Sequence, residues 1–162
     1  MKKLFQILIV FTTVITTQKL HAQSNETIRP IFNHITVYVV NMEKANEFYR
    51  KVMLLKDVAN PFNDGKHTWF ALGNGTQLHV VEGAKEMVPH DINVHLAFSV
   101  PSIKKFMQHL DGLHIKYGDW GGRQGQTQMR PDKVPQIYLQ DIDGYWIEVN
   151  EAAYIKNSVG KD

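Results

Sequence analysis

"FNHITVYVVNMEKANEFY" (residues 32–49) is followed by a second stretch of the same design, "NVHLAFSVPSIKKFMQHL" (residues 93–110). Each stretch opens with a His, continues as alternating apolar residues, turns, and ends in an amphipathic pattern. When His34 and His95 are aligned, the two stretches run without a gap to their ends. A unit that recurs in this way predicts a protein built from two similar modules.

Alternation and helical spacing predict a strand followed by a helix in each unit. Apolar residues alternate with polar ones along both strands, so each His should face away from the apolar side. Asn41 and Ser102 are suitable N-caps for the helices that follow. The expected buried stripes recur at i, i+3, i+4 and i+7, and consist of Ala45, Phe48, Tyr49 and Val52 in the first unit and Ile103, Phe106, Met107 and Leu110 in the second.

Three short strands are predicted after each helix. In the first unit they lie near residues 55–59, 67–72 and 76–82, with the hairpin turn "GNG" at 73–75. In the second unit they lie near 115–120, 136–140 and 145–150, with "DIDG" at 141–144 as the matching turn. The prediction is an α+β fold of paired βαβββ modules. A curved mixed sheet should surround a central cleft, with the helices outside.

The sequence predicts an N-terminal segment that is cleaved off, followed by one domain. Residues 1–22 combine a basic start, a short apolar run and a small residue, Ala22, which is typical of a secretory signal peptide. An uncleaved membrane anchor is the alternative, although the run is short for a span of about 20 residues. Residues 23–162 would form one domain, with module 1 at about 32–82, a linker at 83–92, module 2 at about 93–151 and a polar tail at 152–162.

Charge and cysteine content exclude several classes of function. Removing the three lysines of residues 1–22 from the 18 basic residues leaves 15 against 16 acidic residues, a net charge of −1. That balance gives no argument for nucleic-acid binding. The chain has no Cys, which excludes disulfides, thiolate nucleophiles and thiolate zinc sites. Any metal site must therefore use His, Asp and Glu.

Four side chains are candidates for such a site. Registering the hairpins on Gly75 and Gly144 places His79 and Glu148 at equivalent positions, four residues after each glycine. Strand parity points both toward the side that His34 and His95 occupy. Neutral imidazoles with a carboxylate suit a divalent first-row metal. His79 could instead be a neighbour of the metal site or line a pocket.

Several other residues could bind a substrate. Trp69, Tyr138 and Trp146 could form an aromatic wall, or could be ordinary core and rim residues. Thr36 shares the face of His34. Arg123 and Arg130 lie in a Gly/Gln-rich loop, where they could bind a substrate carboxylate or remain solvated charges.

The chain resembles the vicinal oxygen chelate superfamily over nearly all of residues 32–151. The resemblance rests on "NHITVYVVNMEKANEFY", "VHLAFSV" and "DIDGYWIEVN". The superfamily includes glyoxalase I, bleomycin-resistance proteins, fosfomycin-resistance enzymes and extradiol dioxygenases. It implies paired βαβββ modules around one divalent metal (Zn, Ni, Mn or Fe), with His34, His95 and Glu148 as ligands and His79 where glyoxalase I enzymes often place a fourth, usually Glu.

The resemblance implies a metal-dependent enzyme that acts on a small substrate through two neighbouring oxygens. The leading expectation is an exported, glyoxalase-like lyase or isomerase in which Glu148 exchanges protons with the substrate. The first alternative is an Fe(II) extradiol-type dioxygenase with Tyr138 as an acid/base partner. The second is a non-enzymatic, resistance-type binding module. We expect a periplasmic or secreted protein, no membrane association after cleavage, no nucleic-acid partner, and a homodimer as one possible assembly.

Overall fold

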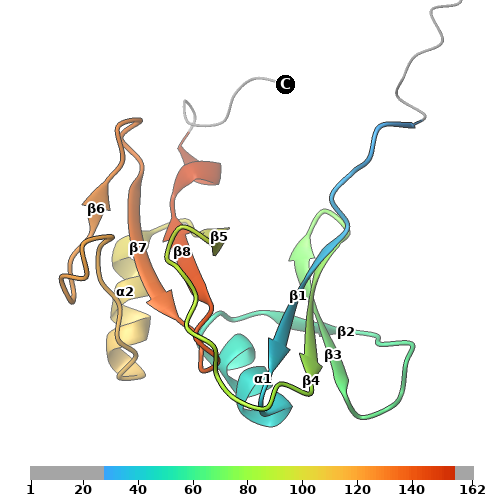
Figure 1. The fold of residues 1–162 in the computed structure, drawn as a ribbon. Coiled ribbons are helices and arrows are strands. Elements are labelled where there is room, and N and C mark those ends of the chain that lie inside the picture. The colour runs from blue at the N-terminus through green and yellow to red at the C-terminus, as the bar shows by residue number, and fades with distance from the viewer. Residues whose placement is uncertain (1–27, 156–162) are drawn as a thin grey trace, which may run out of the picture. The chain divides into compact units, whose positions relative to one another are not determined.

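A computed structural model describes residues 28–155 (Figure 1). The chain divides into two units, residues 1–31 and 32–162, and the second contains every α-helix and β-strand described here. The signal peptide predicted at 1–22 lies outside the described residues, and so does the tail beyond residue 155. Among residues 28–155, no helix has the length and apolar character needed to cross a bilayer.

Module 1 is a four-stranded mixed sheet covered by one helix. Its strands have the order β1-β4-β3-β2, with β1 parallel to β4 and the remaining neighbours antiparallel. The elements are β1 (His34–Val39), α1 (Met42–Lys51), β2 (Lys56–Val58), β3 (His67–Gly73) and β4 (Thr76–Glu82). The predicted βαβββ module is confirmed.

Module 2 repeats this topology. Its strands have the order β5-β8-β7-β6, with β5 parallel to β8. The elements are β5 (His95–Ser99), α2 (Ile103–Gly112), β6 (Gln128–Met129), β7 (Pro135–Gln140) and β8 (Trp146–Asn150), and a short 3-10 turn, η2 (Ala152–Tyr154), follows. The whole is an α+β fold with two four-stranded mixed sheets.

One predicted strand is wrong. Residues 115–120 do not form a strand, and Gly118 makes only isolated bridges, to Gln124 and to Tyr138. Directly after Gly118 the chain turns away from the neighbouring β7. The Asp119 carboxylate closes this turn by accepting hydrogen bonds from the backbone N–H and the side chain of Arg123. The edge strand of module 2 is instead the two-residue β6, which pairs with the start of β7.

The strand parity deduced from the sequence is confirmed in both modules. Leu78, Val80, Ile147 and Val149 are fully buried on the helix-facing sides of β4 and β8. Asn41 and Ser102 cap α1 and α2, each accepting a hydrogen bond from a backbone N–H three residues on. The alternate residues of each strand must therefore project from the opposite side of the sheet.

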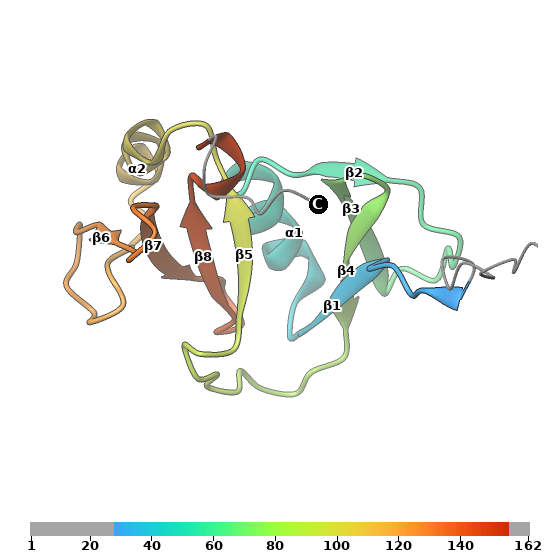
Figure 2. The same cartoon turned by 90° about the horizontal axis from the view of Figure 1, so that it is seen from above.

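The two modules share one hydrophobic cluster and a set of polar contacts. The Tyr49 hydroxyl of α1 donates to Asp141 Oδ2 at 2.6 Å, and the backbone N–H of Val40 donates to Asp143 Oδ1 at 2.7 Å. The backbone N–H of Tyr38 donates to the Tyr145 hydroxyl at 3.0 Å. The "DIDG" turn thus holds β8 against the end of β1 and against α1. The edge strands β1 and β5 are those nearest the other module (Figure 2).

Candidate functional site

The open face of module 1, meaning the side of its sheet opposite α1, carries a column of stacked rings. The His34 and His79 rings are 4.2 Å apart and nearly parallel, and the Trp69 and His79 rings are 4.1 Å apart with an interplanar angle of 2°. β1, β4 and β3 supply these residues in neighbouring registers. Burial, and then the nearby His34 and His67, lower the pKa of His79, which favours the neutral form that a metal requires.

The open face of module 2, opposite α2, brings His95 and Glu148 together. His95 Nδ1 lies 2.8 Å from the carbonyl oxygen of Ile92, which can only accept a hydrogen bond, so Nδ1 carries the proton. In the neutral ring Nε2 then carries the lone pair, and it lies 3.3 Å from Glu148 Oε2. Two acceptors face each other there, a contact that is favourable only when a proton or a cation lies between them.

Glu148 is buried and held by several donors. It is 6% exposed, between the fully buried Ile147 and Val149. The Tyr138 hydroxyl donates to Oε2 at 2.7 Å and the Asn150 side-chain amide donates to Oε1 at 2.6 Å. Burial, together with the bond to Glu148, holds the pKa of Tyr138 well above its ordinary value. Tyr138 is therefore a hydrogen-bond donor to Glu148 at neutral pH.

The four predicted ligands form two pairs. His34 lies with His79 on one face, and His95 lies with Glu148 on the other. Within residues 28–155, no three His, Asp or Glu side chains lie close enough together to hold one metal ion. A single chain thus presents the predicted ligands as two pairs, one on each open face, and these pairs are called half-sites below.

The residues predicted to bind substrate divide in the same way. Thr36 pairs with His79 and is exposed on the open face of module 1, where β4 separates it from Trp69 of β3. Trp146 pairs with His95 on the open face of module 2, where its indole N–H donates to the carbonyl of His90 at 3.0 Å. No ring contact joins Trp69 to Tyr138 or Trp146 among the described residues, so they do not form a single aromatic wall within one chain.

The two arginines have different surroundings. The Arg123 guanidinium binds Asp119 at the base of the loop and is 76% exposed. The Arg130 guanidinium binds Asp132 and also reaches Glu148, with Nη1 3.5 Å from Oε1. Of the two, only Arg130 has a contact with a predicted metal ligand in the described part of the chain.

Sequence reasoning missed the residues that support Glu148. Asn150 Oδ1 accepts from the Ser99 hydroxyl at 2.7 Å and from the backbone N–H of Ala152 at 2.9 Å, which directs its amide nitrogen toward Glu148. The signal was present in the strand pattern, because Asn150 follows Glu148 by two residues and shares its face. The Ser99 contact could not be found by that rule, since it depends on the pairing of β5 with β8.

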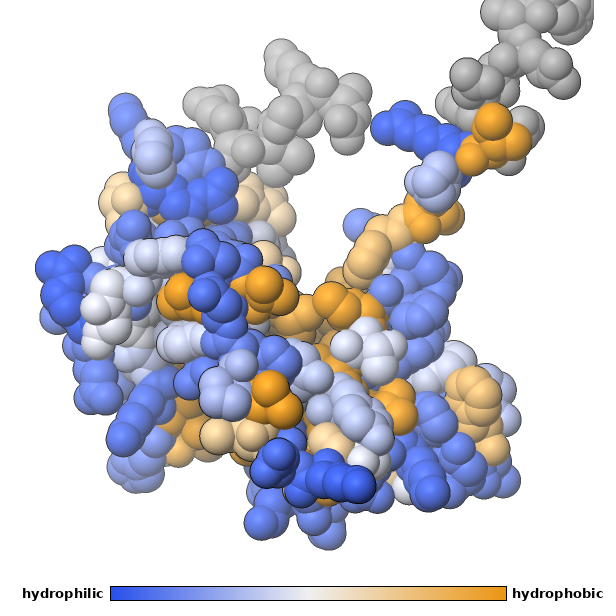
Figure 3. All heavy atoms as spheres, viewed as in Figure 1, coloured by the Kyte–Doolittle hydropathy of each residue, from blue (hydrophilic) through white to orange (hydrophobic). Residues whose placement is uncertain are grey.

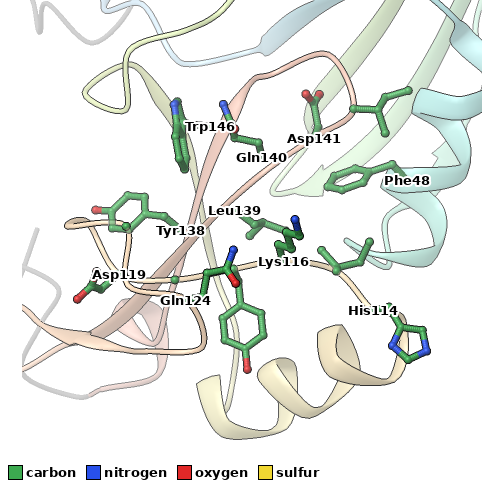
Figure 4. A pocket seen from close by; sticks show the side chains of 15 residues that line it. Phe48, His114, Lys116, Asp119, Gln124, Tyr138, Leu139, Gln140, Asp141 and Trp146 are labelled. Carbon is green, nitrogen blue, oxygen red and sulfur yellow. The ribbon is translucent and has the colours of Figure 1, made fainter.

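A pocket of about 520 Å³ lies along β7 (Figure 4). Tyr138, Trp146, Phe48 and Lys116 line it, whereas none of the four predicted ligands does. Its acids, Asp119 and Asp141, are bound by Arg123 and Tyr49. The four predicted ligands therefore lie outside this pocket.

Comparison with known families agrees with the fold. The model of the Glyoxalase/Bleomycin resistance protein/Dioxygenase superfamily matches residues 31–149. The chain belongs to this superfamily. No curated protein sequence matches the chain.

Solved structures of the superfamily have the same fold. A glyoxalase family protein from Bacillus anthracis is 24% identical, with 75% of this chain and 94% of that chain covered and a TM-score of 0.60. Lactoylglutathione lyase from Agrobacterium tumefaciens is 18% identical, with coverages of 79% and 98% and a TM-score of 0.58. The fosfomycin resistance protein FosX from Listeria monocytogenes is also 18% identical, with coverages of 75% and 93% and a TM-score of 0.59. At these identities the likeness establishes the fold alone.

Proposed function

We propose that this protein is a metal-dependent enzyme, a glyoxalase-like lyase or isomerase that acts on a small substrate through two neighbouring oxygens. The observation that carries the proposal is the contact between His95 Nε2 and Glu148 Oε2, two acceptors that face each other at 3.3 Å. A divalent cation relieves such a contact, and imidazole with carboxylate is a suitable donor set. Superfamily membership supports the same chemistry.

His34, His79, His95 and Glu148 would hold the metal, which when bound supplies Lewis-acid stabilisation of negative charge on the substrate oxygens. Glu148 exchanges a proton with the carbon next to a substrate carbonyl. Tyr138 keeps its proton and holds Oε2 by donating to it. The neighbouring core residues exclude water from the strand that carries Glu148.

We further propose that a second copy of the chain completes each site. Each open face carries two ligands, and His34 and His79 of one copy would lie opposite His95 and Glu148 of the other. Two copies related by a two-fold axis have four open faces in total, and these would pair to make two equivalent sites. Exposed apolar side chains lie in or just before the edge strands β1 and β5, and include Phe32, Tyr38 and Val94. Figure 3 shows hydrophobic residues gathered between the two modules on the side drawn.

An Fe(II) extradiol-type dioxygenase is the second candidate, favoured by the surroundings of His79. Its ring lies between His34 and Trp69, and its Nε2 is bonded to Gln77 Oε1 at 2.9 Å. With His79 held in this way, His34, His95 and Glu148 would form the two-His, one-carboxylate set that suits Fe(II). Tyr138 would then lie beside the reacting oxygens.

The proposal includes export to the periplasm or outside the cell. It rests on the basic, apolar and small-residue pattern of residues 1–22. Intact-protein mass spectrometry, without tryptic digestion, of the protein recovered from its native source measures the mature N-terminus. A start near Gln23 would support export, and an intact Met1 or Lys2 start would contradict it.

Elemental analysis of protein purified without chelator tests the metal site. We expect nearly one metal per chain, and loss of the metal in Glu148→Ala. Zinc, nickel or manganese that is also lost in His79→Ala favours the lyase, whereas iron retained in His79→Ala favours the dioxygenase. Wild-type protein that takes up no metal after reconstitution would contradict both enzymes and leave a binding module.

Mixing two variants that each lose the metal tests whether the site is shared between two copies of the chain. His34→Ala and Glu148→Ala each damage a different half-site. In mixed dimers one site receives both damaged halves and the other receives none, so metal should return to about a quarter of all sites after random exchange. A site built within one chain would give no recovery.

A further inference from the structure

The Arg130 guanidinium is fixed with one nitrogen directed at the open face of module 2. Arg130 Nε and Nη2 donate to the two oxygens of Asp132 at 3.1 and 2.7 Å. This fork sets the plane of the guanidinium and leaves Nη1 as the nitrogen that approaches Glu148. The side chain is 34% exposed, so its free N–H groups remain accessible.

The backbone of Arg130 is equally constrained. Its N–H donates to the carbonyl of Val134 at 2.9 Å, and its carbonyl accepts from Lys133 at 2.9 Å, in the turn between β6 and β7. Val134 is fully buried and anchors this turn. An arginine held at both its backbone and its fork loses little further freedom when it binds a ligand.

Arg130 is not saturated by Glu148. The separation of 3.5 Å between Nη1 and Oε1 is longer than an ordinary N–H···O hydrogen bond of about 2.7–3.2 Å. Glu148 Oε1 already accepts a 2.6 Å bond from Asn150. Nη1 therefore retains donor capacity at 3.5 Å from Oε1 of Glu148, a proposed metal ligand.

We propose that the substrate is a 2-hydroxy or 2-oxo acid whose carboxylate binds Nη1 of Arg130. This inference rests on the proposed function. Because Nη1 lies 3.5 Å from Glu148 Oε1, an anionic group bound to Nη1 would lie near the chelating oxygens rather than at a distant end of the substrate. A carboxylate beside a hydroxyl or carbonyl group supplies both the neighbouring oxygens and the charge that a guanidinium binds.

Glycolate and glycolamide form a matched pair of probes, equal in shape and different in charge. Zinc content of each variant is measured first, and binding of both probes to zinc-loaded protein is then measured by calorimetry. Arg130→Gln should weaken glycolate at least about tenfold, as expected for loss of a charge-assisted hydrogen bond, and change glycolamide less than about twofold. Arg130→Lys should recover part of the loss. Arg123→Gln, which removes an equal charge from the same loop, should change neither probe.

The outcomes separate the inference from the proposed function. Wild-type protein that takes up no zinc contradicts both. Zinc-loaded Arg130→Gln that keeps the wild-type preference for glycolate overturns the inference alone. Equal weakening of the two probes, or loss of zinc from both Arg130 variants, would assign Arg130 to the support of Glu148 and would also overturn it.

Discussion

The side-chain amide of Asn150 donates a 2.6 Å hydrogen bond to Glu148 Oε1, and it is held there by the Ser99 hydroxyl. Asn150 is 5% exposed, so water cannot easily replace Glu148 or Ser99 as its hydrogen-bond partner. The bond holds one carboxylate oxygen, Oε1, while the Tyr138 hydroxyl holds the other, Oε2. Glu148 therefore has a set orientation before any ligand arrives.

Asn150→Ala should lower zinc affinity about 10- to 100-fold, the usual effect of removing a group that orients a metal ligand. The measurement is competition with a chelator of known affinity. Ser99→Ala should act in the same direction with a smaller effect, because the Ala152 N–H still orients the amide. Unchanged affinity in Asn150→Ala would show that Glu148 needs no such support.

Tyr49→Phe should destabilise the protein by about 1.5–3 kcal/mol, because it removes the donor to Oδ2 of the buried Asp141 carboxylate, whose backbone donors bind only Oδ1. Tyr49 is fully buried and Asp141 is 6% exposed, and their bond joins α1 to the second module. Urea unfolding measures the change. Tyr117→Phe is the control, since its hydroxyl donates at 3.0 Å to the exposed Asp111 and should cost less than about 1 kcal/mol. Equal losses would argue against a special role for the link between modules.

Asp141 should make stability depend on pH in an unusual direction. Burial raises the pKa of Asp141, although the Tyr49 hydroxyl and two backbone N–H groups oppose this. A raised pKa in the folded state means that the stabilisation is present below the unfolded pKa of about 3.9 and is lost as pH rises through the folded pKa. The stability of Asp141→Asn relative to wild type should therefore increase as pH rises above about 4.

Asp57→Asn provides a control of opposite sign for that experiment. The Arg50 hydrogen bond lowers the pKa of Asp57, so the stabilisation is present above the unfolded pKa and lost as pH falls through the folded pKa. Its stability relative to wild type should fall slightly as pH rises toward neutrality, since the pair is about half exposed. Parallel slopes for the two variants would contradict the assignment for Asp141.

Gly118→Ala should destabilise the protein by about 1–3 kcal/mol through overpacking. A Cβ at Gly118 would lie 2.6 Å from the backbone oxygen of Arg123, while Gly118 exchanges two backbone hydrogen bonds with Tyr138. Thermal unfolding measures the loss. In Gly112→Ala the added Cβ meets no atom within 4 Å, so no loss is expected. A Gly118→Ala variant as stable as Gly112→Ala would show that the loop at 119–123 moves freely.

Local patterns in the sequence determined the two modules. Period-two alternation placed Leu78, Val80, Ile147 and Val149 in the core, and polar residues with the right spacing became the caps Asn41 and Ser102. Parity also placed His34 with His79, and His95 with Glu148, because strands leave a side chain only two directions. The strand prediction for residues 115–120 was wrong because the Asp119 side chain accepts a hydrogen bond from Arg123 and closes a turn within an otherwise strand-like sequence.

Only the tertiary structure decided which of these residues meet. The sequence placed four ligands on equivalent faces, yet the fold of one chain gathers them as two pairs on two sheets. It also decided that Arg130 reaches Glu148 while Arg123, from the same loop, does not. The reason is physical: parity and spacing act within a strand, whereas distances between sheets depend on the packing of α1, the "DIDG" turn and the shared core.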